Sequence, residues 1–225
     1  MTTRAPMIDN IVSPFGVAKY PKLSEPDTRF KEDGEYSVKL LLDPNDQATQ
    51  NFTASLDDLF SRNLAFHQAQ RDQEMRQKGK DPAKAKKIEG ATKGWRDDAD
   101  PDTGELTGSI EVSAKLAAVG RSQKTGKTWE NRPVVIDSSK QVIHVDVGGG
   151  SVIRFSAQAY GWFTPQLGAG VSLRLKTVQV KELKTWGGDP VEGFDVVEDG
   201  FVGQPSTATV TTAEGQTAGD TSFDF

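Results

Sequence analysis

The chain has 225 residues, of which 35% are hydrophobic and 26% charged, with 22 glycines, 11 prolines and no cysteine. This length allows one well-buried domain with extensions, and the low hydrophobic content is more typical of short strands joined by polar turns than of a compact enzyme. The absence of cysteine excludes disulfides, thiolate metal sites and thiol nucleophiles. No apolar signal-peptide core opens the chain and no segment could span a bilayer, so the sequence predicts a soluble intracellular protein without membrane contact.

Charge is distributed unevenly along the chain. All 27 lysines and arginines lie at or before Lys184, together with 24 of the 32 acidic residues, whereas the remainder has eight acidic residues and no basic one. The net charge of −5 therefore hides a basic body followed by an acidic end. These two parts carry opposite electrostatic fields.

The acidic end has the composition of a tether. Residues 204–219 contain a single larger apolar residue, so they cannot bury enough surface to offset the entropy of ordering. The tether ends in carboxylates interleaved with aromatic rings, at Asp220, Phe223, Asp224 and Phe225. Such an end can imitate an anionic strand with stackable rings and dock on a partner. The alternative is a frayed terminus that only keeps the protein soluble.

Hydrophobic periodicity predicts a mainly β chain. Residues 11–23 are strand-like but interrupted by Pro14 and Pro21, which are tolerated only at an edge or a bulge. In residues 35–42, Tyr36, Val38, Leu40 and Leu42 alternate with Ser37, Lys39 and Leu41, as in a half-buried strand. Further strands are expected at residues 108–119, 129–136, 141–147, 151–163, 170–183 and 194–197.

One helix interrupts the strands. Helix-start residues at 43–46 precede apolar residues at steps of three and four, which predicts a helix over 44–77. Residues 78–93 carry six lysines against two acidic residues, which is typical either of a mobile basic arm or of a solvated helix end. An aspartate-rich loop is expected at 95–105 and a polar hairpin loop at 121–128.

Strands of unequal length, one inserted helix and no alternation of strands with helices predict a small closed or nearly closed barrel rather than an open parallel sheet. We expect one domain over residues 1–203. The helix and basic arm of about 44–93 are inserted between its strands, and a flexible acidic tail follows at 204–225.

Two candidate motifs, one for phosphate binding and one for calcium binding, lack the residue spacing that such sites require. Gly126 is followed by Lys127 and Thr128, but the residue five positions before it is Arg121 rather than glycine, and the loop leads into a strand rather than a helix. The aspartates at 98, 100 and 102 resemble a calcium loop, but the glycine is one position late and the twelfth residue is a serine. Neither motif predicts a site.

The two histidines, His67 and His144, belong to different elements and neither lies in a nucleophile context. We therefore expect no enzyme, no metal and no cofactor. The acidic run at 97–102 is the one crude candidate for a metal-dependent nuclease, which magnesium-dependent DNA cleavage would reveal.

The strand at 151–163 carries the candidate site. Ile153, Phe155, Ala157 and Ala159 form one apolar face, while the opposite face places Arg154, Tyr160 and Trp162 in line with hydrogen-bonding side chains. Cations that follow phosphates and rings that stack on unpaired bases are the two parts of single-strand binding. This face therefore predicts a surface for single-stranded nucleic acid with little sequence preference.

Neighbouring elements add to this face. Cations are expected from two further strands and one loop, and one more ring from the end of that loop: Lys115, Arg174, Lys176, Arg121, Lys124, Lys127 and Trp129. Each aromatic residue, Trp162 included, could instead belong to the core or the barrel rim. The prediction rests on the interleaving of rings with cations.

The chain resembles bacteriophage single-stranded DNA-binding proteins of the OB-fold class. The resemblance is carried by Tyr20–Asp27, Gly34–Leu42, Gly150–Arg154 and Gly170–Val180, and by the tail that ends in phenylalanine. It covers residues 7–200 in pattern. The length of the segment from Pro44 to Lys93 departs from the family and puts strand order and subunit contacts in doubt.

The resemblance implies a five-stranded barrel that binds single-stranded DNA in phage replication, recombination and repair, in the cytoplasm of the infected host. It implies a tail that contacts phage or host replication proteins, competes with DNA for the basic groove and in some members mediates a homodimer. Two other functions stay open: a protein that also grips duplex DNA or anneals strands through residues 78–93, and a phage structural or assembly protein that binds no DNA.

Overall fold

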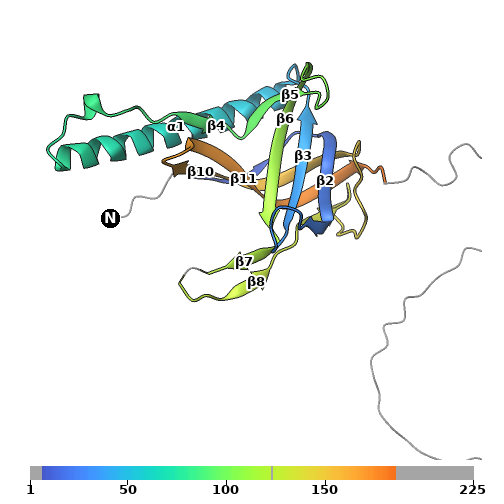
Figure 1. Ribbon diagram of the computed structural model, residues 1–225. Helices are drawn as coiled ribbons and strands as arrows, with labels where there is room; N and C mark the ends of the chain where they lie inside the picture. The colour runs from blue at the N-terminus through green and yellow to red at the C-terminus, as the bar shows by residue number, and fades with distance from the viewer. Residues whose placement is uncertain (1–6, 123, 186–225) are drawn as a thin grey trace, which may run out of the picture. The chain divides into compact units, whose positions relative to one another are not determined.

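The computed structural model describes residues 7–122 and 124–185. They form a mainly β structure with one long helix (Figure 1). The elements in chain order are β1 (Met7–Val12), β2 (Gly16–Asp27), β3 (Glu35–Leu42), α1 (Gln47–Gln77), the 3-10 turn η1 (Pro82–Lys84), β4 (Gly90–Thr92), β5 (Trp95–Ala99), β6 (Leu106–Ala117), β7 (Val119–Arg121), β8 (Thr128–Glu130), β9 (Val134–Ile136), β10 (Val152–Thr164) and β11 (Gly168–Glu182). In this part of the chain no helix is both long and apolar enough to cross a membrane.

Five strands close into a barrel in the order β10, β2, β3, β6, β11 and back to β10. Neighbours are antiparallel except β6 and β11, which run parallel. The shorter strands extend this ring, since β1 pairs with β10, β5 with β6, and β4 and β9 with β11. The predicted closed barrel is confirmed, and its five strands match the OB-fold class.

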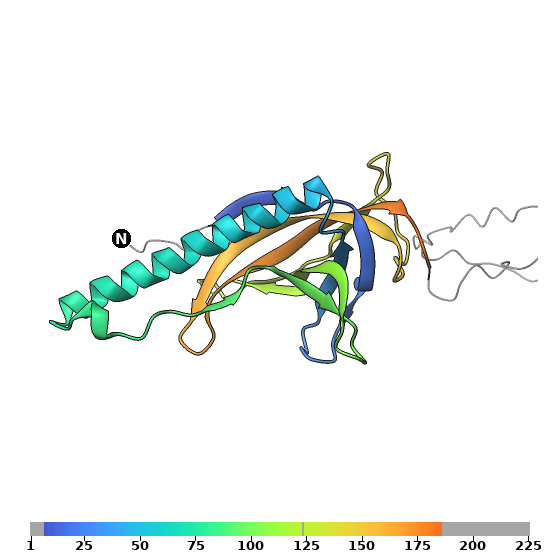
Figure 2. The ribbon, with the colours of Figure 1, turned by 90° about the horizontal axis from the view of Figure 1, so that it is seen from above.

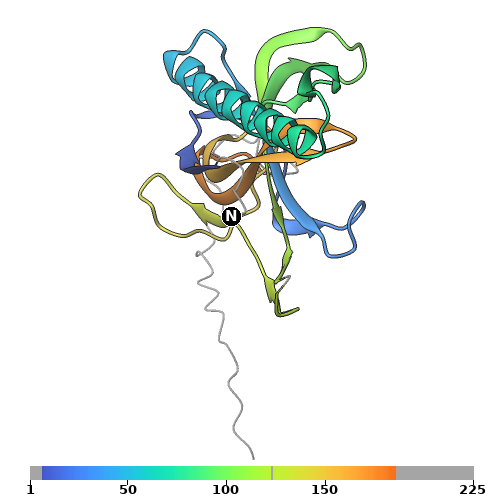
Figure 3. The same cartoon turned by 90° about the vertical axis from the view of Figure 1, so that its left-hand side faces the viewer.

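A two-stranded ribbon of β7 and β8 projects from one end of the barrel (Figures 1 and 3). It is the hairpin predicted around residues 121–128, and Arg121 pairs with Thr128 at its tip. The prolines also lie where the sequence places them: Pro14 separates β1 from β2, and Pro21 lies at a register shift within β2.

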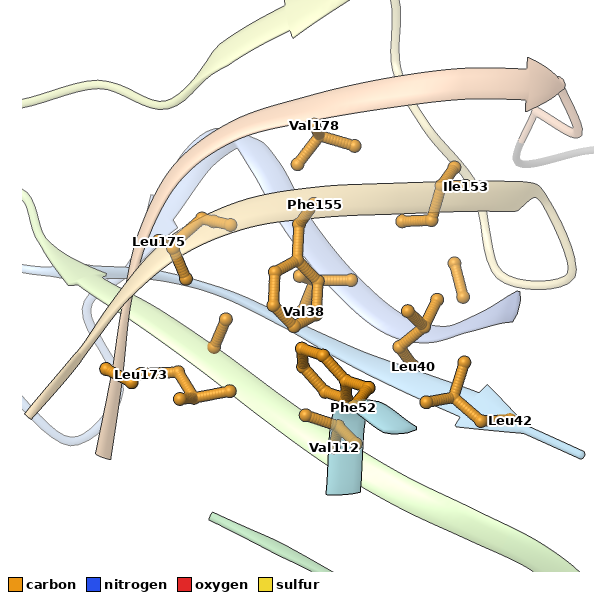
Figure 4. Packing of buried hydrophobic residues seen from close by; sticks show 14 of the residues in the cluster. Val38, Leu40, Leu42, Phe52, Val112, Ile153, Phe155, Leu173, Leu175 and Val178 are labelled. Carbon is orange, nitrogen blue, oxygen red and sulfur yellow. The ribbon is translucent and has the colours of Figure 1, made fainter. Parts of the chain in front are cut away.

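Alternate side chains of the barrel strands fill one core. Val38, Leu40 and Leu42 of β3 and Ile153 and Phe155 of β10 are buried. Figure 4 shows them meeting around the Phe155 ring, with Phe52 of α1 entering the same cluster. Burying a side chain of this size stabilises the fold by about 1.5 to 3 kcal/mol. The burial of these residues confirms the predicted inward faces of β3 and β10.

The helix α1 packs with its N-terminal half on β10 and β11 and extends beyond the barrel with its C-terminal half (Figure 2). It begins at Gln47 rather than at Pro44, because the carboxylate of Asp46 accepts the backbone N–H of Thr49 at 3.2 Å and caps the first turn. It ends at Gln77, as predicted. Its buried face includes Leu56, Leu59 and Asn63.

The basic segment after α1 is attached to the rest of the structure near its C-terminal end. It returns along the helix, where the backbone N–H of Ile88 donates to Gln68 Oε1 at 3.1 Å, and it reaches β11, where Glu89 O accepts from the N–H of Ala169 at 3.0 Å. Arg71 also donates to the carbonyl oxygen of Lys86. These contacts hold residues 86–89 against α1 and β11, and composition alone could not predict them.

Three other expected elements differ. The expected strand at 129–136 is divided into β8, which pairs with β7, and β9, which pairs with β11. Part of the expected loop at 95–105 is strand β5, whose charged sequence hides its pairing with β6. The expected strand at 141–147 makes only one isolated bridge, between Ile136 and Val142. Its alternation reflects Ile143, Val145 and Val147 packing on the core without a ladder. The expected strand at 194–197 and the expected tail at 204–225 lie outside the described residues.

Candidate nucleic-acid interface

The strand registers build a polar row around the outer surface of the barrel. Lys22 pairs with Ser37, Ser37 with Lys115, Lys115 with Arg174, and Arg174 with Gln158. Directly paired residues of neighbouring strands point to the same face. This row therefore passes over all five barrel strands and brings Lys115 and Arg174, which are far apart in the sequence, side by side.

A groove of about 540 Å³ lies over the part of this row formed by Lys115 and Arg174. It unites three of the residues predicted from the sequence, Lys115, Tyr160 and Arg174. Its other lining residues come from β3, β4, β5, β6 and β11 and the loops beside them: Lys31, Glu35, Thr92, Gly94, Trp95, Arg96, Glu111, Ser113, Ala117, Val171, Ser172 and Leu173.

The groove is positively charged on balance. Its cations are Lys31, Arg96, Lys115 and Arg174, and its carboxylates are Glu35 and Glu111. Glu111 is only 4% exposed and binds Arg96 at 2.7 Å and Lys39 at 3.0 Å. These contacts hold the cations in place but also neutralise part of their charge.

Glu35 is the second carboxylate of the groove. It accepts from Lys115 at 3.0 Å and from Lys31. Burial alone would raise the pKa of Glu35, but the two lysines lower it further than burial raises it. The Glu35 carboxylate is therefore charged at neutral pH. Arg174 has no carboxylate partner among the described residues, so it is the cation of the groove best able to bind a phosphate.

Two predicted aromatic side chains lie beside these cations. The Arg174 guanidinium stands 5.4 Å from the centre of the Tyr160 ring, a cation–π contact. Trp162 donates from Nε1 to Ser172 Oγ at 2.9 Å, and Ser172 lines the groove. Both rings are half-buried on the outer face of β10, so they are neither core residues nor freely mobile.

A buried asparagine supports this corner from behind. Asn63 of α1 has no exposed surface and donates from Nδ2 to the carbonyl oxygens of Trp162 at 2.9 Å and Gly170 at 3.0 Å. Trp162 and Gly170 pair across β10 and β11. The helix thereby fixes the two strands at the point where the Trp162 side chain leaves the barrel.

The β7–β8 ribbon holds four further predicted residues. Arg121, Lys124 and Lys127 are exposed, and the Trp129 side chain is 51% exposed. Trp129 lies over Gly120, its partner in the ribbon, and donates from Nε1 to Asn131 Oδ1 at 3.0 Å. The ribbon follows β6 just after the groove residue Ala117, but none of these four residues lines the groove.

The other two predicted residues lie outside the groove. Arg154 donates to Gln179 Oε1 at 2.8 Å and covers the Phe15 ring at 4.6 Å, near the opposite end of β10 from Tyr160. Lys176 lies at a β-bulge, where the register of β11 against β10 shifts, and contacts Asn10. Bulges re-aim side chains, and period-two alternation alone cannot place them.

Several lining residues have no sequence signal. Trp95 and Arg96 belong to the strand that was expected to be a loop, and Lys31 lies in a turn before β3. Arg96 lies opposite Glu111 in the ladder between β5 and β6. This contact could be predicted only if the pairing of the two strands were already known. Over the described ranges no group of three or more acidic or histidine side chains is placed to hold a metal ion.

The chain is similar to phage single-stranded DNA-binding proteins. It is 37% identical over 98 residues to the single-stranded DNA-binding protein of Enterobacteria phage T3 and 36% identical over 104 residues to that of Escherichia phage T7. The matched segments span 41% and 44% of this chain, and 42% and 44% of those relatives, so less than half of their length. No family model matches the chain.

A solved structure extends the likeness to the whole fold. The crystal structure of gp2.5, a single-stranded DNA-binding protein encoded by bacteriophage T7, superposes with a TM-score of 0.60 at 22% identity. The superposition covers 87% of this chain and 99% of that one. The two proteins therefore share the same overall fold.

Proposed function

We propose that this protein binds single-stranded DNA, with little dependence on sequence, in the groove that contains Lys115, Tyr160 and Arg174. The juxtaposition of two cations and an aromatic ring along one groove carries the proposal. Lys115 and Arg174 are positioned to hold phosphates, and Tyr160 and Trp162 to stack on bases. The likeness to the phage proteins of T3 and T7 supports the same function.

The chemistry of the groove explains why sequence would matter little. Every base has a flat face that can stack on tyrosine or tryptophan, which contributes about 1 to 3 kcal/mol per base, and every nucleotide has a phosphate. The β7–β8 ribbon, with Arg121, Lys124, Lys127 and Trp129, extends the path beyond the groove. Arg154 and Lys176 would contribute only if DNA leaves the groove and follows the barrel surface.

The proposal is tested with fluorescence anisotropy of a labelled oligothymidine at low and moderate salt. The double variant Lys115→Ala/Arg174→Ala should bind more weakly, and the slope of log affinity against log salt should fall by about 0.7 for each lost phosphate contact. Lys140→Asn is the matched control, because it also removes a cation but lies outside the groove, at a positive φ of 65° that asparagine tolerates. Absence of binding by the unaltered protein at low salt would refute the proposal and favour the structural or assembly role.

The acidic tail belongs to this proposal as a competitor. Asp220, Phe223, Asp224 and Phe225 would occupy the basic groove when DNA is absent and recruit replication proteins of the phage or host when DNA displaces them. A version of the chain that ends at Gly203 should therefore bind oligothymidine more tightly than the full chain at low salt. Equal affinity would leave the tail without a role at the groove. A homodimer through the tail is tested by sedimentation of the same two versions.

The biological setting follows from the proposed binding. We place the protein in the replication, recombination and repair of phage DNA in the cytoplasm of the infected host, as a binding protein rather than an enzyme. A second candidate, annealing or duplex binding, is favoured by the exposed lysines of the ordered segment from Lys78 to Lys93. Comparing duplex with single-stranded oligomers separates the two functions.

A further inference from the structure

Tyr20 has an unusual backbone conformation. Its φ is +51°, in the left-handed region that bulky side chains rarely occupy. It follows Lys19 at the point where the register of β2 against β3 shifts, which marks a β-bulge. Strained residues that the surrounding structure holds in place cluster at binding sites, and glycine or asparagine would fit this backbone at a lower cost. The strained backbone at Tyr20 therefore indicates that the tyrosine side chain has a function that offsets the cost of the strain.

The Tyr20 ring is exposed, and it lies beside two lysines that carboxylates hold in place. Its side chain is 56% exposed, and the ammonium groups of Lys19 and Lys39 lie 5.9 and 6.0 Å from the ring centre. Each lysine is anchored by a carboxylate that is almost fully buried: Asp98 at 2.6 Å and Glu111 at 3.0 Å. The ring is thus supported by two cations that cannot move freely.

The lysines under the ring retain hydrogen-bonding capacity. An ammonium group has three N–H donors, and the carboxylate of Asp98 or Glu111 takes one from each lysine. A phosphate oxygen next to the Tyr20 ring could accept from the remaining donors. This surface combines a stackable ring with two preoriented cations, as the groove does at Tyr160 and Arg174.

The strand registers place this surface in line with the groove. Lys19 pairs with Lys39, and Lys39 pairs with Ser113, which lines the groove. Glu111, which anchors Lys39, also lines it. Counted across the groove-lining strands, Tyr20 on β2 and Tyr160 on β10 are separated by β3, β6 and β11, although β2 and β10 also pair directly at Val17 and Val152. Four strand spacings of about 4.8 Å amount to about 19 Å along the barrel surface.

We propose that Tyr20 is a second base-stacking platform, so that bound DNA crosses the barrel strands from Tyr160 to Tyr20. This inference rests on the proposed function and assigns a path to the strand. It adds a contact that the sequence pattern missed, because a bulge rather than alternation turns Tyr20 outward.

Two substitutions separate stacking from structure. Tyr20→Asn keeps a residue that tolerates the left-handed backbone but removes the ring, so the thermal midpoint should not fall, while affinity for a long oligothymidine should drop about 5- to 150-fold. Tyr20→Phe keeps the ring and should bind within about twofold of the unaltered protein. Unchanged affinity of Tyr20→Asn, a loss that comes with a lower midpoint, or an equal loss in Tyr20→Phe would each overturn the inference.

Oligothymidines of increasing length test the path. The affinity of the unaltered protein should rise until both platforms are covered, and Tyr20→Asn should reach its plateau at a shorter length. Identical length profiles for the two proteins would contradict a second platform. If the unaltered protein binds no oligothymidine at all, the proposed function itself fails. If it binds and Tyr20→Asn matches it at every length, only this inference fails.

Discussion

Trp162 lies across Gly170, and a Cβ atom added to Gly170 would come within 2.4 Å of the Trp162 ring. The same relationship recurs in the β7–β8 ribbon, where a Cβ on Gly120 would come within 2.3 Å of the Trp129 ring. In both cases tryptophan and glycine pair across antiparallel strands. The two proposed stacking tryptophans thus depend on a glycine that leaves room for the ring, an arrangement also used to protect glycines in sheets.

Gly170→Ala should displace the Trp162 ring and break its hydrogen bond to Ser172. We expect weaker binding of oligothymidine, by about 5- to 150-fold if one stacked base is lost, and a loss of about 1 to 3 kcal/mol in the free energy of unfolding. Anisotropy and urea unfolding measure the two effects. Gly149→Ala is the control, because its nearest neighbour would be 3.9 Å away. Equal behaviour of the two variants would show that the ring does not need Gly170.

Asn63→Ala should destabilise the protein more than most substitutions in α1. It leaves the buried carbonyl oxygens of Trp162 and Gly170 without the Asn63 amide, at a cost of about 1 to 3 kcal/mol for each deprived group. We expect the free energy of unfolding to fall by about 2 to 6 kcal/mol in urea titrations. Arg62→Ala removes only an exposed ion pair to Asp58 and should change it by less than 1 kcal/mol. A similar small effect for both would contradict the structural role of Asn63.

Asp98→Asn should leave the ammonium of Lys19 without its charged partner. Asp98 is buried, with a side chain 3% exposed, and its pKa lies below the ordinary value because Lys19 donates a hydrogen bond to it. We expect a loss of about 3 kcal/mol, the lower end for breaking a buried pair, since Lys19 keeps some contact with water. Asp58→Asn, in an exposed pair, is the control, and thermal unfolding is the measurement.

The lowered pKa of Asp98 also determines in which direction acid changes the stability of the protein. The stabilisation from ionised Asp98 is complete above the ordinary carboxyl pKa of 3.8 and is lost as the pH falls below it, because the unfolded chain takes up the proton first. The advantage of the unaltered protein over Asp98→Asn should therefore shrink between pH 4 and the folded-state pKa. A constant difference over that range would argue against the pair.

His67 should make the stability of the protein depend on pH closer to neutrality than Asp98 does. Its ring stacks on Phe163 at 4.9 Å, and burial lowers its pKa below the ordinary 6.5. The unfolded chain therefore binds a proton more readily, so stability should decline as the pH falls from about 6.5. His67→Phe should flatten the thermal midpoint between pH 7.5 and 5.5. His144→Gln, at an exposed position, is the control and should keep the decline.

Sequence patterns predicted the barrel because its core obeys simple periodicity. β3 and β10 alternate without interruption, so their inward and outward faces could be assigned residue by residue. The groove partners Lys115 and Arg174 were identified as outward cations for the same reason. Their adjacency could not be predicted, because it depends on the parallel pairing of β6 with β11, a contact between segments far apart in the chain.

Irregular backbone explains what periodicity missed. Tyr20 and Lys176 lie at bulges. β5 is charged because Arg96 and Asp98 form ion pairs, and only Trp95 of this strand packs against the core among its large side chains. Arg154 was assigned to the groove on alternation alone, but it lies near the far end of a long strand from Tyr160. Alternation tells which face a residue occupies and not how far along a curved strand it stands.

Closure of the ring links the first strands of the chain to the last. β1 and β2 both pair with β10, and β6 pairs with β11, so during synthesis the early strands have exposed edges until Glu182 has left the ribosome. Contacts of such sequence separation form slowly, and unpaired edges invite association with other chains. A nascent chain of this protein therefore acquires its fold, and with it the assembled groove, only when the last barrel strand arrives.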